Sequence, residues 1–165
     1  MKRLVALILA VLLAMPFLSG CRGSGKTDGK LMLEKIREAH GELPAGRVYH
    51  SEAEEGDPEF LSLHKLEGLY GKKHISVCLP LVSHWAIYLS SFALPWEMAV
   101  FVCHSKSDTD TVAKMCFARG DIIKAYILHR EEYSHISAEV WVKDNIVAMY
   151  VGGSPMEAER AFMRG

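Results

Sequence analysis

The N-terminal segment places the strongest constraint on how this chain can fold. Lys2 and Arg3 give it a basic start, and an almost uninterrupted apolar run follows from Leu4 to Leu18. This order is typical of a secretion signal. The run of fifteen residues is shorter than the ~20 that a bilayer-spanning helix usually needs, although an uncleaved membrane helix stays an alternative. We therefore expect the folded domain to come from the residues after this segment.

The apolar run ends in the letters "LSGC", residues 18–21, which resemble the lipobox of bacterial lipoproteins. In that family the cysteine receives a diacylglyceryl group, and a peptidase cuts just before it. The resemblance implies a lipoprotein signal peptide at residues 1–20 and lipidation at Cys21. Membrane lipid is then the first partner. The resemblance also implies a location: anchored to the bacterial cell membrane, with the domain facing outside the cytoplasm.

The same stretch also satisfies a P-loop pattern, G-x-x-x-x-G-K-T, which ends in Gly25, Lys26 and Thr27. A P-loop joins a buried strand to a helix, because backbone N–H groups and the helix N-terminus must converge on phosphate. Here the apolar signal comes before the pattern, and Gly29 after it opposes a helix that continues from the loop. We therefore predict no nucleotide or other cofactor, and we interpret residues 21–29 as a flexible tether.

Length and composition predict one small domain after the tether. Removing 20 of the 165 residues leaves 145, and we assign residues 30–165 to a single domain. The shortened chain carries 17 basic and 20 acidic side chains, so no basic face for nucleic acid is expected. Cys78, Cys103 and Cys116 lie in apolar runs, and we expect buried thiols there. Whether two of them form a disulfide stays open.

The first half of the domain predicts helices joined by a polar connection. Asp28 can cap a helix over residues 29–40 that stops at Gly41, and a polar connection follows over residues 41–56. Residues 57–71 read as a short helix, because an Asp-Pro pair opens them and a glycine ends them. Residues 75–81 read as an interrupted strand, since proline cannot donate to a central ladder.

The second half predicts two β-hairpins, each followed by a helix. The expected strands cover residues 84–92, 97–104, 138–143 and 146–151, and the expected helices cover residues 108–130 and 155–163. A capping box formed by Ser107 and Asp110 is expected to begin the longer helix. The apolar residues that recur along this helix at helical spacing are expected to face the core: Val112, Met115, Ile122, Tyr126 and Ile127. This order favours an α+β fold with an antiparallel sheet of four to five strands and helices packed mainly on one face.

The last hundred residues or so resemble a family of small bacterial lipoproteins that is known only as a domain of unknown function. The likeness rests on "LEGLYG", the "AIYLSS…EMAVFVC" hairpin, the "SDTDTVAKMCFAR" helix and "VAMYVGGSPMEAERAF". The resemblance implies an extracytoplasmic lipoprotein domain of α+β type. Because the family has no established activity, it implies no catalytic residue.

The eight histidines raise the question of a metal or catalytic site. His84, His104, His129 and His135 fall near predicted element ends, but no pair shows the close ligand spacing that zinc sites usually need. Cys103 lies beside His104, yet neighbours in a strand point to opposite faces. We therefore predict no metal site and no catalytic residue. An envelope hydrolase whose His and Cys side chains come together from distant segments remains the alternative.

Arg119 is the charged residue that the helical pattern does not explain. It occupies the apolar register between Met115 and Ile122, where the stem can lie along the core edge while the guanidinium reaches water or an acid such as Glu97. An anion-binding site is the other interpretation. The next residue, Gly120, is costly inside a helix and indicates close packing or a kink. The letters "RGD" at 119–121 fall inside the same helix, so we discount an integrin-type ligand.

Trp96 is the second candidate site residue. Together with Pro95 it lies in the turn between two predicted strands, where a large amphipathic ring can contact a partner or fold back over the sheet. From these observations we expect a tethered, non-catalytic binding or accessory module of the cell envelope. Its partner, an envelope protein or a small ligand, is not identified by the sequence.

Overall fold

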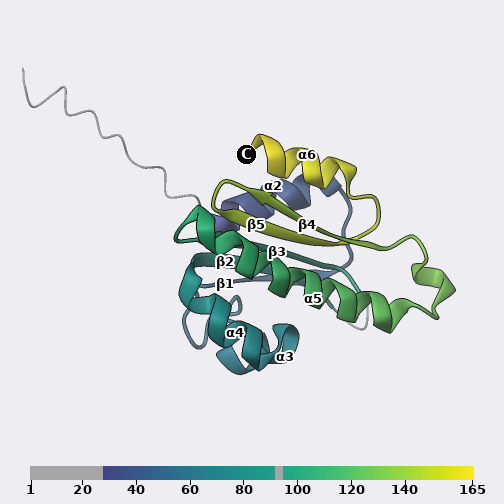
Figure 1. The fold of residues 1–165 in the computed structure, drawn as a ribbon. Helices are drawn as coiled ribbons and strands as arrows, with labels where there is room; N and C mark the ends of the chain where they lie inside the picture. Colours follow the sequence, from purple (N-terminus) through teal and green to yellow (C-terminus); the bar gives the residue numbers. More distant parts are fainter. Residues whose placement is uncertain (1–27, 92–94) are drawn as a thin grey trace, which may run out of the picture.

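A computed structural model describes residues 28–91 and 95–165 (Figure 1). The signal peptide, Cys21 and Lys26 lie outside the described residues, so the predictions about them stay predictions. The described part has an α+β fold built on a five-stranded antiparallel sheet, which confirms the predicted class and strand number. None of the helices in these two ranges has the length and apolarity that crossing a membrane requires.

The sheet has the strand order β1-β2-β3-β5-β4. Its strands are β1 (Gly46–His50), β2 (Val82–Ser90), β3 (Glu97–Cys103), β4 (Ser137–Lys143) and β5 (Ile146–Gly152). Both predicted hairpins form, as β2–β3 and β4–β5, and Asp144 and Asn145 make the two-residue turn of the second. Asp144 has a φ of 52°, the left-handed backbone that such a tight turn favours.

Helices cover both faces of this sheet. The described α-helices are α2 (Gly29–His40), α3 (Leu63–Tyr70), α4 (Lys72–Cys78), α5 (Thr109–Ile127) and α6 (Met156–Arg164). Three of them, α3, α4 and α5, pack on one face, which we call the α5 face. The other two, α2 and α6, pack on the opposite face, the α2 face, where we had expected few helices (Figure 1).

The central strands explain why both faces are covered. Every residue of β3 and β5 is buried, so neither face of these strands can be left to water. Alternation divides β3 between the two cores: Ala99 and Phe101 join the α5 face, while Met98 and Val100 join the α2 face. By the same alternation Glu97 belongs to the α5 face, and this position decides its partners.

Two local predictions in the first half were wrong. The polar connection contains the edge strand β1, where Gly46 lies so close to β2 that a Cβ would be 2.5 Å from the Leu89 carbonyl oxygen. The predicted interrupted strand is α4 followed by the 3-10 turn Leu79–Leu81, and Pro80 is accommodated in that turn. In both places tertiary packing outweighs the local signal.

Helix boundaries agree with the sequence where a cap is unambiguous. The side chain of Asp28 accepts from the backbone N–H groups of Lys30 and Leu31, and Gly41 ends α2 with a φ of 85°. By contrast, α3 begins after Ser62 and not at Asp57. The capping box before α5 is formed by Ser105 and Asp108, two residues earlier than expected, because a 3-10 turn precedes the helix.

The predicted apolar face of α5 was only partly right. Val112, Met115 and Ile127 are buried as expected, but Ile122 and Tyr126 are exposed, and Ile123 is buried instead. Gly120 explains how the helix approaches the sheet: a Cβ there would lie 3.2 Å from the Cβ of Ala138 in β4. The predicted close packing at this glycine is therefore confirmed.

Candidate functional site

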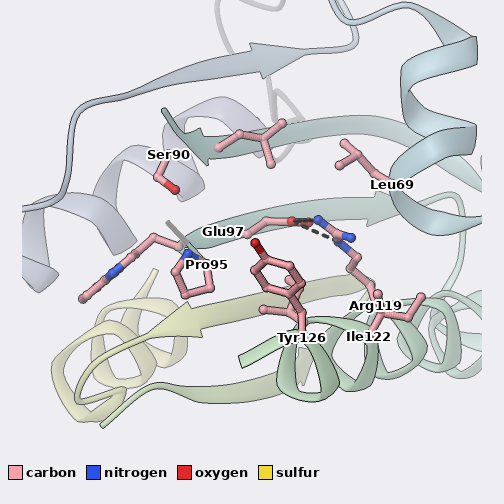
Figure 2. A pocket seen from close by; sticks show the side chains of 10 residues that line it. Leu69, Ser90, Pro95, Glu97, Arg119, Ile122 and Tyr126 are labelled. Atoms are coloured by element: carbon pink, nitrogen blue, oxygen red, sulfur yellow. Dashed lines mark hydrogen bonds and ion pairs between the residues drawn. The ribbon is translucent and has the colours of Figure 1, made fainter. Parts of the chain in front are cut away.

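A pocket of about 370 Å³ opens between α5 and the end of the sheet where β2 stops and β3 begins (Figure 2). Apolar side chains form much of its wall, among them Leu69 of α3, Leu89 of β2 and Ile122 of α5. The two residues singled out in the sequence, Trp96 and Arg119, both line this pocket. The structure thus brings together two candidates that lie on different elements.

A buried ion pair lies at the inner wall of the pocket. The Nε and Nη2 of Arg119 donate to Glu97 Oε2 at 3.0 and 2.7 Å, and Figure 2 shows the two side chains pointing toward each other. Glu97 is only 2% exposed, whereas the side chain of Arg119 is 17% exposed and reaches the pocket. Arg119 is therefore in a structural ion pair with the acid that the sequence suggested.

Tyr70 completes the hydrogen bonding of this carboxylate. Its hydroxyl donates to Glu97 Oε1 at 2.8 Å, and its ring packs edge-on against Phe101 at 5.6 Å. Burial and the neighbouring Glu97 charge raise the pKa of Tyr70 well above its ordinary value, so the hydroxyl keeps its proton. Glu97 thus accepts three hydrogen bonds inside the protein. The sequence singled out Arg119 and Glu97 but gave no sign of this role for Tyr70.

The electrostatics of the pair keep Arg119 charged and fixed. Burial alone would lower the pKa of Arg119, but the charge and hydrogen bonds of Glu97 outweigh it, and the pKa is raised. Nη1 makes no hydrogen bond within the described part of the chain and is not among its buried unsatisfied atoms. One edge of the guanidinium is therefore held by Glu97, and Nη1 remains available to a ligand.

Trp96 lies at the end of the sheet, where it lines the pocket and also packs against the core of the α2 face. The side chain is partly buried. A Cβ built on Gly152 would be 2.7 Å from the Trp96 ring, so this glycine makes room for it. The ring therefore folds back over the sheet, while a contact between Trp96 and a partner stays a prediction.

His40, the last residue of α2, packs against Trp96. Its ring meets Trp96 edge-on at 5.1 Å and lies 5.8 Å from the ring of Tyr150. Nδ1 of His40 is buried and has no hydrogen-bond partner among the described residues. Burial lowers the pKa of His40, and the nearby backbone of Glu42 opposes this only in part. The folded protein therefore favours the neutral imidazole.

This environment predicts loss of stability in mild acid. Because the pKa of His40 is lower in the folded chain than in the unfolded chain, the unfolded chain binds more protons between the two values. The free energy of unfolding should fall as the pH drops below the ordinary histidine value of about 6.5. Thermal unfolding at a series of pH values should show a shallower slope for His40→Gln than for wild type. His129→Gln, at an exposed position, should keep the wild-type slope; equal slopes in all three proteins would contradict the prediction.

The other histidine and cysteine candidates do not meet at this pocket. Cys103 is buried in the α5-face core, where burial raises the pKa of its thiol to about 11. His104 is exposed, and His84 lies 3.4 Å from Glu52. His129 follows the C-terminal end of α5, a helix of nineteen residues and about 28 Å that separates it from His104. Within residues 28–91 and 95–165, no three His, Cys, Asp or Glu side chains are placed to hold a metal ion.

The three cysteines inside the domain are free and buried, as expected. All of them belong to the α5-face core. Burial and the nearby Glu97 raise the pKa of Cys116 well above its ordinary value. These thiols act as small apolar side chains.

The comparisons with known proteins assign no activity to this site. Comparison with protein-family models, with curated proteins and with solved structures found no significant match. The chemistry of the site therefore has to be argued from its geometry. A guanidinium held by a carboxylate, beside an apolar wall, can bind and orient a ligand.

Proposed function

We propose that this chain is a lipid-anchored protein of the bacterial cell envelope, with its domain outside the cytoplasm, and that its pocket beside Arg119 binds a small, largely apolar ligand. The anchoring rests on the sequence, in which a basic start, an apolar run and "LSGC" follow one another at the spacing of a lipoprotein signal. The binding rests on the pocket itself. The protein is then a binding module and not an enzyme.

The observation that carries the binding proposal is the composition of the pocket. Its volume of about 370 Å³ falls in the range of small-molecule sites, roughly 300–1,000 Å³. Exposed apolar side chains form its rim, because Ile122 and Tyr126 are each more than half exposed. Covering these two side chains with an apolar ligand would remove their surface from water, which is favourable. The buried ion pair provides a rigid polar group that is formed before any ligand arrives.

Binding can be tested through the three tryptophans of the chain. We would label the full chain, held in lipid nanodiscs, with ¹⁵N-tryptophan and titrate it with indole, a neutral, apolar and water-soluble probe. Trp96 lines the pocket, whereas Trp85 and Trp141 are buried in the two cores. Indole should shift the Trp96 signal and leave the other two in place. A titration in which no signal moves, or all three move alike, would contradict the proposal.

A matched pair of variants separates the pocket from the general surface. Ile122 and Phe117 lie on the same helix and are 56% and 54% exposed, but only Ile122 lines the pocket. Ile122→Glu should abolish the indole-dependent shift, because it places a charge at the apolar rim. Phe117→Glu should leave the shift unchanged. Loss of binding in both variants would mean that the probe binds the apolar surface without using the pocket.

A further inference from the structure

We infer that the pocket selects an uncharged ligand with an apolar body and a carbonyl-type hydrogen-bond acceptor, which Arg119 Nη1 receives. This inference rests on the proposed binding function and specifies the chemical class of the ligand. It follows from the charge of the pocket, from the hydrogen-bond donors that face it and from the apolar wall. Each of these can be read from the described residues.

The charge of the pocket argues against an ionic ligand. Glu97 and Arg119 are the only lining residues with a formal charge in the part of the chain that the structure describes, and they neutralise each other at 2.7 Å. An anion placed on Arg119 would lie close to the buried Glu97 carboxylate and would have to leave water without a counter-charge of its own. The Nε–Nη2 edge of Arg119, one of the edges that can bind an anion bidentately, is already occupied by Glu97.

The donors and acceptors of the pocket specify the ligand's polar group. Nη1 of Arg119 can only donate. The Tyr126 hydroxyl lines the same pocket and accepts from Arg130 at 3.1 Å, so its own proton remains for donation. The acceptor capacity of Glu97 is used by three hydrogen bonds from Arg119 and Tyr70. Ser90 also lines the pocket, and its hydroxyl can both donate and accept. Arg119 and Tyr126 contribute donors, and a carbonyl oxygen of an amide, ester or ketone complements them.

The apolar wall specifies the rest of the ligand. Leu69 and Leu89 lie on the side of the pocket formed by α3 and β2, and Ile122 lies on the side formed by α5. Burying apolar ligand surface between these sides contributes about 25 cal/mol for each Å² removed from water. A hydrocarbon or aromatic body that ends in a neutral carbonyl group satisfies both the wall and the donors.

The test compares two probes that share the same apolar body and differ in the charge of the polar group. 4-Phenylbutanamide is neutral, whereas 4-phenylbutanoate is ionised at about pH 7. Using the ¹⁵N-tryptophan chain in nanodiscs, we expect the amide to shift the Trp96 signal with a dissociation constant about tenfold lower than that of the carboxylate. Equal affinity, or tighter binding of the carboxylate, would overturn the ligand class while indole binding upholds the pocket. If neither these probes nor indole moves Trp96, the proposed binding function itself fails.

Conservative variants test the two donors. Tyr126→Phe removes one donor without touching the ion pair and should weaken amide binding about two- to tenfold. Tyr133→Phe is the matched control, because Tyr133 also contacts Arg130 but does not line the pocket. Arg119→Lys keeps the charge and loses Nη1, so it should weaken the amide further while unchanged Trp85 and Trp141 signals report an intact fold. Unchanged amide affinity in both Tyr126→Phe and Arg119→Lys would overturn the assignment of these donors.

Discussion

Replacing Arg119 by methionine is expected to lower the free energy of unfolding by about 3–5 kcal/mol, the usual cost of breaking a buried ion pair from one side. Methionine can fill much of the space of the arginine stem, so lost packing is not the main effect. The cost arises because the Glu97 carboxyl group, 2% exposed, would be left buried without the partner that donates twice to Oε2. A neutral or mildly stabilising effect would be expected only if the substitution left no buried acid unpaired, and Glu97 is such an acid.

The measurement is chemical unfolding of the full chain, followed by far-ultraviolet circular dichroism. A triple variant supplies the control: Tyr70→Phe, Glu97→Leu and Arg119→Met together remove every polar partner in the group. Because apolar replacement of a whole buried ion pair is often neutral or stabilising, the triple variant should recover most of the loss. Two results would contradict this account of the ion pair. The first is a loss of less than about 1 kcal/mol in the free energy of unfolding of Arg119→Met, and the second is a triple variant that is no more stable than Arg119→Met.

Replacing Cys21 by serine is expected to abolish lipid attachment completely and to leave an uncleaved precursor. The "LSGC" letters resemble the lipobox of bacterial lipoproteins, and in that family the cysteine sulfur receives the diacylglyceryl group. Serine has no sulfur at this position. Incorporation of labelled fatty acid and the size of the chain on a gel are the two measurements. Wild type should be labelled and shortened, whereas Cys21→Ser should be unlabelled and full length.

Lys26→Ala is the control for this experiment, because Lys26 belongs to the competing P-loop pattern. It should change neither lipid labelling nor the size of the chain. Tight ATP binding that is lost on Lys26→Ala would overturn the lipoprotein interpretation. Labelling that survives in Cys21→Ser would place the anchor on another residue.

The parts of the fold that the sequence predicted are those with two agreeing local signals. The β4–β5 hairpin combines apolar strands with the Asp144–Asn145 turn, and α2 combines helical spacing with the Asp28 cap. The parts that failed depend on contacts that are distant in the chain. Strand β1 forms because β2 offers it an edge, and α4 forms although its short apolar segment also resembles a strand.

The candidate site shows the same division. Helical spacing drew attention to Arg119, and the sequence analysis named Glu97 as an acid that its guanidinium could reach. Tyr70 could not be assigned, because it lies 27 residues before Glu97 and meets it only through the packing of α3 on the sheet. Ile122 and Tyr126 were predicted as core. Their exposure at the rim of a pocket follows from the rotation of α5 about its axis, which a period alone does not determine.

Gly29, at the start of α2, and the pocket lie at opposite ends of the sheet. A Cβ on Gly29 would lie 3.6 Å from Val102, near the C-terminal end of β3, whereas the pocket lies beside Glu97 at the other end. The five residue-to-residue steps from Glu97 to Val102 span about 17 Å. The seven residue-to-residue steps from Cys21 to Asp28 reach at most about 25 Å when fully extended. On the proposed anchoring, the tether therefore joins the domain at the end of the sheet opposite the pocket, so the attachment itself leaves the binding mouth uncovered.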